Sequence, residues 1–292
     1  MWANEQTWLR AGKDIRNVTL NPRNLHRTDT TWLEAGNDII NADLSVERPG
    51  SVLLTAGRDV YNPRTVSIGN RRFDSSNRPI TGTDIRGLPA DGASIDVIAG
   101  LNGKSPDYTA FVAAYLDPAK VAAMPAYLTT TVDGQIVPLY LTDAYDDTRD
   151  GKQIQLGLVS FVADVTGQTL SPTQAWTAFQ TLSPFIQQRF IRQVYMQELR
   201  EAGRDQNDRL LTGGYNRGYA AIGTLFPGSG WKGSVVSPSV YFRTMSGGDI
   251  TVMTPGGGFQ LASLQTPVPD GDGAWSRSAM ATSTSSRATA SP

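Results

Sequence analysis

One nine-residue phrase occurs three times near the start of the chain, and it constrains the fold more than any other feature. Its consensus is Leu-x-Ala-Gly-x-Asp-Ile/Val-x-Asn, and the copies span residues 9–17, 33–41 and 54–62. The alanines of the copies are Ala11, Ala35 and Ala56, so the successive steps are 24 and 21 residues. That period matches one coil of a β-solenoid and is too short for a repeated pair of helices. We therefore predict that the copies are successive coils of one stack.

The residue types within the phrase support this prediction. Leu9 and Ala11 stand two residues apart, so both side chains point to the same side of an extended strand. Gly12 interrupts the strand with a bend, and Ile15 resumes the inward side after it. A single coil cannot bury these apolar residues, but stacked coils share one interior and satisfy each other's main-chain hydrogen bonds. We expect each coil to be stabilised by its neighbours.

Stacking in register would place the polar residues of the phrase in columns. The aspartates could hold a cation, but aspartates at bends more often accept hydrogen bonds from backbone amides, and we favour that interpretation. The asparagines are expected to form a ladder of side-chain amides. We therefore predict a structural repeat with no metal, no cofactor and no catalytic residue. The repeat residues are Leu9, Ala11, Gly12, Asp14, Ile15, Asn17, Leu33, Ala35, Gly36, Asp38, Ile39, Asn41, Leu54, Ala56, Gly57, Asp59, Val60 and Asn62, and an altered later copy contributes Gly248, Asp249 and Ile250.

Composition removes several other classes of protein. The 26 basic residues nearly balance the 27 acidic ones, so there is no basic field to attract nucleic acid. Cysteine is absent, which excludes a disulfide scaffold and thiol chemistry and suits a chain that crosses membranes unfolded. No signal peptide and no apolar run of membrane-spanning length is visible. Because the first phrase starts at Leu9, we expect earlier coils to precede it.

The remaining sequence predicts a mainly β protein, a β-solenoid interrupted by a mostly helical insertion. We expect β-helix coils over 1–103, with a loop excursion at 71–92, the insertion over 104–216, resumed β-helix over 217–268 and a disordered Ser/Thr/Ala-rich tail over 269–292. Helices are predicted at 108–116, 172–181 and 184–202, with Gly203 as the last stop signal and an apolar stripe through Phe190 and Val194. Asp133-Gly134 predicts a hairpin turn.

Candidate catalytic residues are few. Asp143, Asp146, Asp147 and Asp150 form the only dense acidic cluster, which a carbohydrate-active enzyme could use as paired carboxylates, although a solvated loop is the simpler interpretation. His26 is the sole histidine, and no Gly-x-Ser-x-Gly motif accompanies it, so a serine hydrolase is disfavoured. The glycine run at 256–258 has no following lysine, which argues against a phosphate-binding loop.

The phrase resembles the large exoproteins of the filamentous haemagglutinin family, which are secreted by the two-partner route. Further segments are similar to a C-terminal region of outer-membrane proteins in that family. These segments are Leu170-Ser171-Pro172-Thr173-Gln174-Ala175, residues 198–204, residues 217–228 and Gly247-Gly248-Asp249-Ile250. The resemblance covers about residues 8–265. The family's N-terminal secretion domain and a C-terminal toxin are not recognised in this sequence.

The resemblance implies a right-handed parallel β-helix. It also implies a secreted or surface-displayed bacterial adhesin of the virulence type, exported by an outer-membrane β-barrel transporter. Its partners would be a receptor or glycan on a host or neighbouring cell. We expect a non-catalytic structural or adhesive segment, with the helical insertion as a possible contact site. Two alternatives stay open: the stalk of a contact-dependent toxin-delivery exoprotein, and a carbohydrate-active β-helix enzyme.

Overall fold

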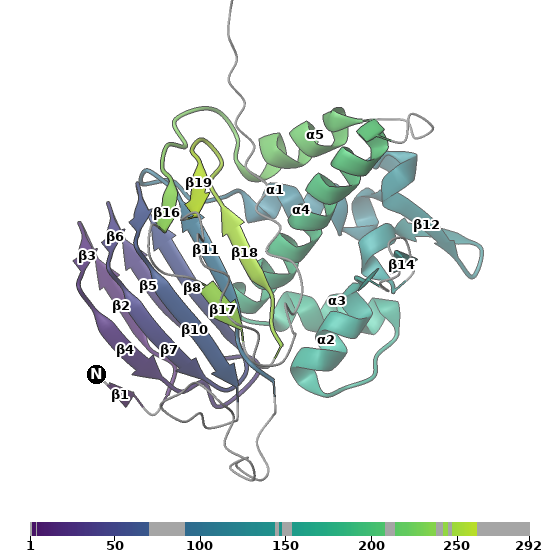
Figure 1. Ribbon diagram of the computed structural model, residues 1–292. Coiled ribbons are helices and arrows are strands. Elements are labelled where there is room, and N and C mark those ends of the chain that lie inside the picture. The colour runs from purple at the N-terminus through teal and green to yellow at the C-terminus, as the bar shows by residue number, and fades with distance from the viewer. Residues whose placement is uncertain are drawn as a thin grey trace, which may run out of the picture. The chain divides into compact units, whose positions relative to one another are not determined.

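The computed structural model describes residues 2–3, 5–69, 91–143, 146–147, 154–207, 214–237, 242–244 and 247–261 (Figure 1). These residues belong to two compact units. The first, here called the sheet unit, comprises Met1–Ser105 and Ser229–Pro292, and the second, the helical unit, comprises Pro106–Gly228. Within the described ranges, no helix is long and apolar enough to cross a membrane.

Three five-stranded parallel sheets form the sheet unit, and consecutive strands along the chain belong to different sheets. One sheet has the order β18-β11-β8-β5-β2, the second β19-β16-β9-β6-β3 and the third β1-β4-β7-β10-β17. The strands are β1 Trp2–Ala3, β2 Trp8–Ala11, β3 Ile15–Arg16, β4 Thr19–Pro22, β5 Thr30–Ala35, β6 Ile39–Ile40, β7 Asp43–Glu47, β8 Ser51–Ala56, β9 Val60–Tyr61, β10 Arg64–Gly69, β11 Ser94–Ala99, β16 Val235–Ser237, β17 Phe242–Thr244, β18 Ile250–Met253 and β19 Phe259–Leu261.

The three copies of the phrase pair in register, residue for residue. Ala11 pairs with Ala35, Ala35 with Ala56, and Ala56 with Ala99 of β11. The leucines of the phrase pair in the same way, as do the inward residues of β3, β6 and β9. The parallel sheets and their spacing therefore follow the repeat that the sequence contains.

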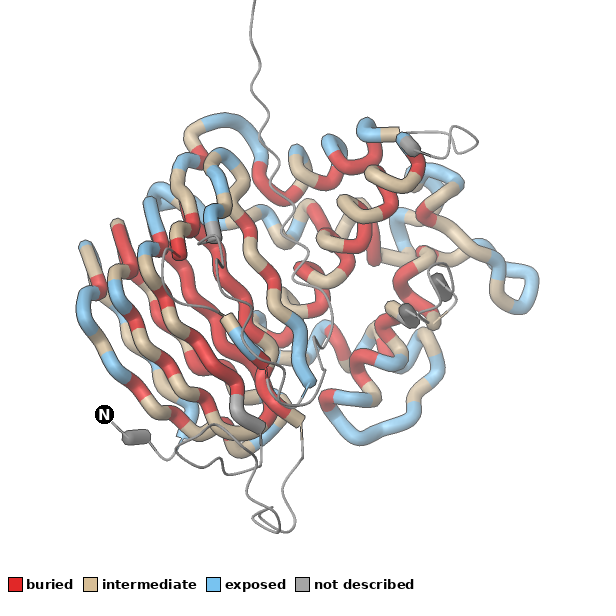
Figure 2. The backbone as a smooth tube through the Cα atoms, in the orientation of Figure 1, coloured by how far each residue is buried: buried red, intermediate tan, exposed pale blue. Residues whose placement is uncertain are grey.

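One apolar core lies among the three sheets. The side chains of Leu33, Leu54 and Val97 are fully buried, and so are Ile39 and Val60. In Figure 2 the buried stretches run along the inner strands β8 and β11. The outermost strand β2 is the exception, since its residues alternate between exposed and half-buried. A strand that pairs with a neighbour on both sides thus buries side chains that an end strand leaves partly exposed.

The sequence prediction that residues 248–250 are a later copy of the phrase is wrong. Ile250 of β18 pairs with Ile95, which pairs with Val52, so Gly248, Asp249 and Ile250 do not continue the columns of Gly36, Asp38 and Ile39. The column of Ile39 and Val60 continues instead through Val235 and Phe259. A three-residue match cannot define register, because the apolar column at Val52 accepts isoleucine equally well.

The aspartates of the phrase accept hydrogen bonds from backbone amides at the neighbouring bend. The Asp38 amide donates to Asp14 Oδ1 at 3.2 Å, the Asp59 amide to Asp38 Oδ1 at 3.1 Å, and the Ser234 amide to Asp59 Oδ1 at 2.7 Å. Ser234 then takes the same role, since its Oγ accepts from the Gly258 amide at 3.2 Å. The column thus caps backbone amides, as the sequence predicted.

The asparagines form the expected ladder at another bend. Asn41 Nδ2 donates to Asn17 Oδ1 and Asn62 Nδ2 donates to Asn41 Oδ1, both at 2.9 Å. All three residues adopt left-handed backbone conformations, with φ of 51° or 52°. Asparagine suits this position twice over, because it tolerates positive φ better than other side chains and supplies both donor and acceptor.

Replacing Asn41 separates these two contributions. Asn41→Ala removes both ladder hydrogen bonds and puts at positive φ a residue that tolerates it less well than asparagine, so we expect the free energy of unfolding to fall by about 2 kcal/mol. Asn41→Gly removes the hydrogen bonds but relieves the backbone, and we expect a loss of about 1 kcal/mol. Urea unfolding followed by circular dichroism measures both. A glycine variant less stable than the alanine variant would contradict the backbone argument.

The helical unit contains five α-helices among its described residues, together with short strands and 3₁₀ turns. The α-helices are α1 Tyr108–Tyr115, α2 Leu158–Thr166, α3 Pro172–Thr181, α4 Pro184–Asn207 and α5 Tyr215–Leu225. The other elements are η1 Pro118–Ala123, η2 Ala126–Leu128, β12 Thr129–Val132, β13 Gln135–Pro138, η3 Leu139–Leu141, β14 Asp146–Asp147 and β15 Ile154–Gln155. The unit therefore surrounds one long helix, α4, with shorter elements.

The apolar stripe of α4 packs inside the helical unit. Phe190 contacts Phe161 of α2 and Phe179 of α3, with ring centroids 4.9 and 5.9 Å apart. Tyr195 contacts Phe111 of α1 at 6.2 Å and Phe226 at 5.7 Å. The stripe is packing surface, as its spacing predicted, and its partners are the neighbouring helices.

Several local predictions are confirmed and two are wrong. Ser171 and Gln174 form the expected capping box of α3, and β12 and β13 pair around Asp133-Gly134. The helix end predicted at Gly203 is wrong, because α4 continues to Asn207. In this last turn the buried Asp205 lies 3.8 Å from Arg217. The resumed β-structure expected from residue 217 also differs, since α5 occupies 215–225. Most of the predicted 71–92 loop and the whole 269–292 tail lie outside the described residues.

Candidate functional site: a buried ion pair and an adjoining groove

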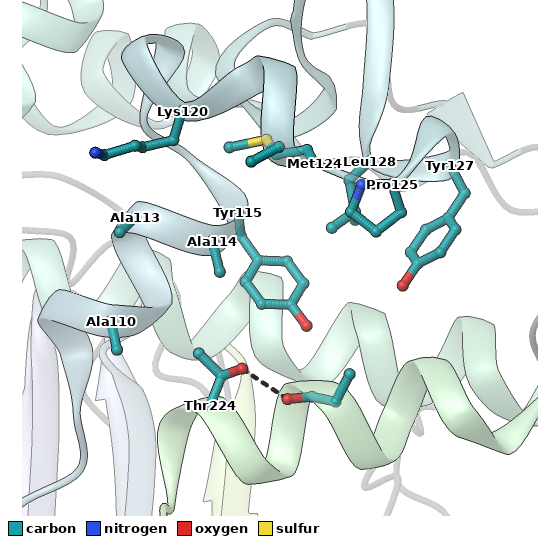
Figure 3. Close-up of a pocket in the computed structure, with 12 residues that line it drawn as sticks. Ala110, Ala113, Ala114, Tyr115, Lys120, Met124, Pro125, Tyr127, Leu128 and Thr224 are labelled. Atoms are coloured by element: carbon teal, nitrogen blue, oxygen red, sulfur yellow. Dashed lines mark hydrogen bonds between the residues drawn. The ribbon is translucent and has the colours of Figure 1, made fainter.

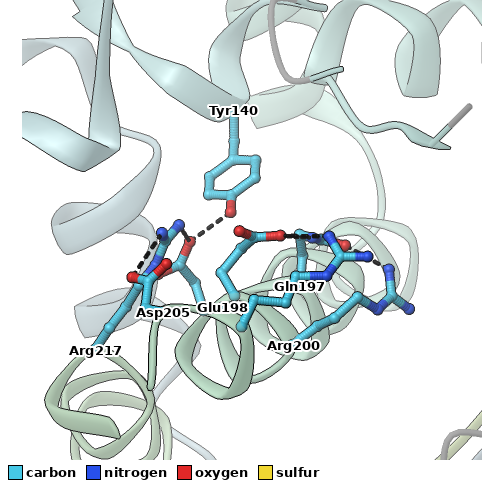
Figure 4. Close-up of polar contacts among 8 residues, drawn as sticks. Tyr140, Gln197, Glu198, Arg200, Asp205 and Arg217 are labelled. Carbon is cyan, nitrogen blue, oxygen red and sulfur yellow. Dashed lines mark hydrogen bonds and ion pairs between the residues drawn. The ribbon is translucent and has the colours of Figure 1, made fainter. Parts of the chain in front are cut away.

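The helical unit holds a buried polar cluster on α4 and α5, which we call the Glu198 cluster (Figure 4). Arg217 grips Glu198 with two hydrogen bonds, from Nε to Oε2 and from Nη2 to Oε1, each 2.7 Å long. The Tyr140 hydroxyl also donates to Glu198 Oε1. The Glu198 side chain is fully buried and the Arg217 side chain is 7% exposed. Both carboxylate oxygens of Glu198 therefore accept a hydrogen bond from Arg217, and Oε1 accepts another from Tyr140.

The electrostatics of Arg217 follow from its neighbours. Burial opposes its charge, but the hydrogen bonds and charge of Glu198, with smaller contributions from Tyr140 and Glu201, outweigh burial and raise the pKa of Arg217. Asp205 adds a second carboxylate 3.8 Å from Arg217 Nη1. The guanidinium also lies over the Tyr127 ring, 4.6 Å from its centroid. Arg217 therefore connects α4 and α5 to the η2 turn.

Further polar contacts continue along α4. Gln197 Nε2 donates to Glu201 Oε1 at 2.9 Å, and Arg200 Nη1 donates to Gln197 Oε1 at 2.6 Å. Arg204 pairs with Glu201 at 2.9 Å. Buried charges are costly unless paired, so this row of contacts is what permits a polar face inside the unit.

A groove of about 500 Å³ lies in the same unit, between α1, α5 and the η1–η2 segment (Figure 3). Its walls consist mainly of small or apolar side chains. Tyr115 and Tyr127 bring two hydroxyls, and a third, on Thr224, donates to Ala220 O at 2.8 Å. The lining residues are Ala110, Ala113, Ala114, Tyr115, Lys120, Ala123, Met124, Pro125, Tyr127, Leu128, Ala220 and Thr224. We call this space the α1–α5 groove.

Both groove tyrosines stay neutral over a wide pH range. Burial raises the pKa of Tyr115, and the negative charge of Glu198 adds to the effect. Burial likewise raises the pKa of Tyr127, again with Glu198 as the next cause. Tyr115 is 3% exposed and stacks on Phe111 with centroids 4.2 Å apart. The groove thus presents two protonated hydroxyls in apolar surroundings.

The residues singled out in the sequence lie elsewhere. Asp14, Asp38 and Asp59 are capping residues of the sheet unit, and Arg16 and the Asp38 amide lower the pKa of Asp14 by hydrogen bonding to it. Asp143 Oδ1 accepts from the Ser160 amide at 3.0 Å. Asp146 and Asp147 lie in β14, and the residues around Asp150 lie outside the described ranges.

His26 belongs to a turn in the sheet unit, where its amide donates to Asp29 Oδ2 at 2.9 Å. Across the described ranges, no three His, Asp or Glu side chains are grouped to hold a metal ion.

The Glu198 cluster and the groove were not predicted, although one signal was present. Val194, Glu198, Ala202 and Asp205 follow each other at helical spacing, so the apolar stripe of α4 changes into a row containing carboxylates. A carboxylate in a buried stripe requires a buried cation. Arg217 could not be chosen from sequence, because its helix α5 begins in a glycine-rich stretch.

No protein-family model, no curated protein and no solved structure matches this chain. The fold and the site must therefore be interpreted from their own geometry.

Proposed function

We propose that the chain is a non-catalytic adhesive segment of a large surface-displayed bacterial exoprotein, built as a right-handed parallel β-helix that carries a helical module. The observation that supports it best is the in-register pairing of the phrase in three parallel sheets. Each third strand returns to the same sheet, one coil further along. Such stacking extends by addition of coils, which suits a rod that holds a binding surface away from a cell.

The position of the helical unit in the chain supports the role of a displayed module. The chain leaves the sheets after Ala99 of β11, at the bend that follows alanine in every copy of the phrase. It returns at β16, whose Val235 pairs with Val60. The amide of Val60 donates to Ser234 O at 2.9 Å, as equivalent amides do in the earlier coils. The coil therefore closes across the insertion.

The two connecting segments run close together beside the sheets. Gly100 and Gly233 approach so closely that a Cβ on Gly100 would lie 2.7 Å from the Gly233 amide nitrogen. Asn102 Nδ2 donates to Gly230 O at 3.0 Å, and Lys104 Nζ lies 5.3 Å from the Trp231 ring centroid. A closed neck of this kind lets a coil carry an insertion without losing its register.

The resemblance to the filamentous haemagglutinin family supplies the biological side of the proposal. In such a protein the β-helix is exported through an outer-membrane β-barrel transporter, and the segment binds a receptor or glycan on another cell. We assign that contact to the helical unit, because it interrupts the repeat while the repeat itself is continuous on either side.

Replacing residues 106–228 by a short Gly-Ser linker tests this assignment. Because the neck is closed, we expect the deleted protein to keep the parallel β signal in circular dichroism and its protected strand amides in hydrogen exchange. We expect binding of the labelled protein to epithelial cells and to a glycan array to be lost. As a control, Arg10→Met changes only the exposed Arg10–Glu34 pair on the sheets and should leave binding intact. Binding that survives the deletion would place the contact on the sheet unit.

A further inference from the structure

We propose that the α1–α5 groove is a binding site for a small neutral carbonyl amphiphile, a ketone or ester with a compact hydrocarbon body. The inference does not depend on the adhesive function. It is carried by two tyrosine hydroxyls, those of Tyr115 and Tyr127, which line this mostly apolar groove and have no hydrogen-bond partner among the described residues.

The space itself suits a small molecule. Its volume of about 500 Å³ lies within the range of ligand pockets, which are mostly apolar with a few placed polar groups. Ala110 and Ala114 of α1 and Ala220 of α5 line the groove with small side chains. Figure 3 shows Met124 and Leu128 on the side opposite Ala110 and Ala114. A hydrocarbon body would replace water along these surfaces.

Tyr115 provides the polar anchor. Its ring is held by stacking on Phe111, and the residue is 3% exposed. The hydroxyl opens into the groove, where a ligand that accepts its hydrogen bond would take the place of water. Tyr115 lines the groove, and no described residue accepts a hydrogen bond from its hydroxyl. This hydroxyl can therefore donate to a ligand in the groove.

Tyr127 provides a second hydroxyl. Its ring is held by the Arg217 guanidinium, and Figure 3 shows its hydroxyl pointing toward the side of the groove where Tyr115 lies. The part of the chain that the structure describes contains no hydrogen-bond partner for this hydroxyl either. A carbonyl oxygen, which has two lone pairs and no proton, accepts from one or both hydroxyls.

The charges near the groove favour a neutral ligand. Both hydroxyls stay protonated, because burial and Glu198 raise the pKa of each tyrosine. Arg217 is already paired with Glu198, so it offers no free cation to a carboxylate. Lys120 lies at the rim, and Figure 3 shows its ammonium group directed away from the tyrosines. An anionic head would therefore enter an apolar site without a counter-ion.

Titration of the full chain with 4-phenyl-2-butanone tests the proposal. Methyl NMR of the methionines reads the site directly, since Met124 lines the groove while Met253 lies in the sheet unit. We expect saturable shifts of Met124 with Met253 unchanged. Butylbenzene, which lacks the carbonyl, and 4-phenylbutyrate, which is anionic, are each expected to bind at least tenfold more weakly.

Two tyrosine variants make the test specific. Tyr115→Phe removes the unpartnered hydroxyl, so we expect about tenfold weaker binding, the effect of one hydrogen bond, with an unchanged or higher unfolding midpoint. Tyr140→Phe is the matched control, because it removes a hydroxyl that Glu198 uses but that does not line the groove. It should lower stability and leave affinity unchanged. Absence of Met124 shifts, equal binding of butylbenzene, or full affinity in Tyr115→Phe would each overturn the proposal.

Discussion

Alanine at Gly36 or Gly57 is expected to lower the free energy of unfolding of the sheet unit by about 3 kcal/mol, at the upper end of overpacking costs. A Cβ at Gly36 would lie 2.2 Å from the carbonyl oxygen of Gly12, and a Cβ at Gly57 would lie 1.9 Å from that of Gly36. The atoms in the way are backbone atoms of the preceding coil, so neither can move without breaking the register of the stack.

Gly12→Ala is the matched control for these two variants. No atom lies within 4 Å of a Cβ built there, and Gly12 does not adopt positive φ. Alanine at this position should be neutral or should stabilise the protein by up to about 1 kcal/mol. Urea unfolding combined with hydrogen exchange of the β5 and β8 amides measures the effect within the sheet unit. Equal destabilisation by Gly12→Ala and Gly36→Ala would show that stacking contacts do not explain the glycines.

Removing one partner of the buried Glu198–Arg217 pair is expected to destabilise the helical unit by about 3–5 kcal/mol. Arg217→Met leaves the Glu198 carboxylate fully buried with Tyr140 as its remaining donor, and Glu198→Leu leaves the guanidinium with only the more distant Asp205. Thermal unfolding followed by the helical signal at 222 nm measures the loss.

The double variant Glu198→Leu with Arg217→Met separates desolvation from attraction. Replacing a buried pair by apolar residues is often nearly neutral, so we expect the double variant to be more stable than either single one. Arg204→Met serves as the comparison, because the Arg204 side chain is 20% exposed and Gln197 still donates to Glu201 after the change, so we expect a smaller loss than in Arg217→Met. Additive losses in the double variant would contradict this account.

Short-range patterns account for the parts of the fold that were predicted. The phrase repeats its inward residues at a period of one coil, and a shift of one residue would turn Leu33 and Ala35 outward, so the pairing register follows from burial alone. The capping box at Ser171, the Asp133-Gly134 turn and the asparagine ladder depend on neighbours in sequence or on exact repetition. Such features are visible without coordinates.

The continuation of the repeat past the insertion shows where pattern matching stops. Ser234 replaces aspartate in the capping column, because any side-chain oxygen at that place can accept the amide of the next coil. Gly248-Asp249-Ile250 keeps the letters of the phrase but occupies another column. Once the insertion interrupts the spacing, a different residue can take the same structural role, and the same residues can occupy a different position.

The sequence by itself determined the repeat period, the inward residues of the phrase and the starts of α1, α3 and α4, because these depend on local backbone preferences and on periodicity. Only the tertiary structure decided which residues meet across long separations. Val235 pairs with Val60, Arg217 pairs with Glu198, and Tyr115 and Tyr127 come together in the lining of the α1–α5 groove. Those outcomes depend on burial and on the need to pair buried polar groups, and both are properties of the packed unit as a whole.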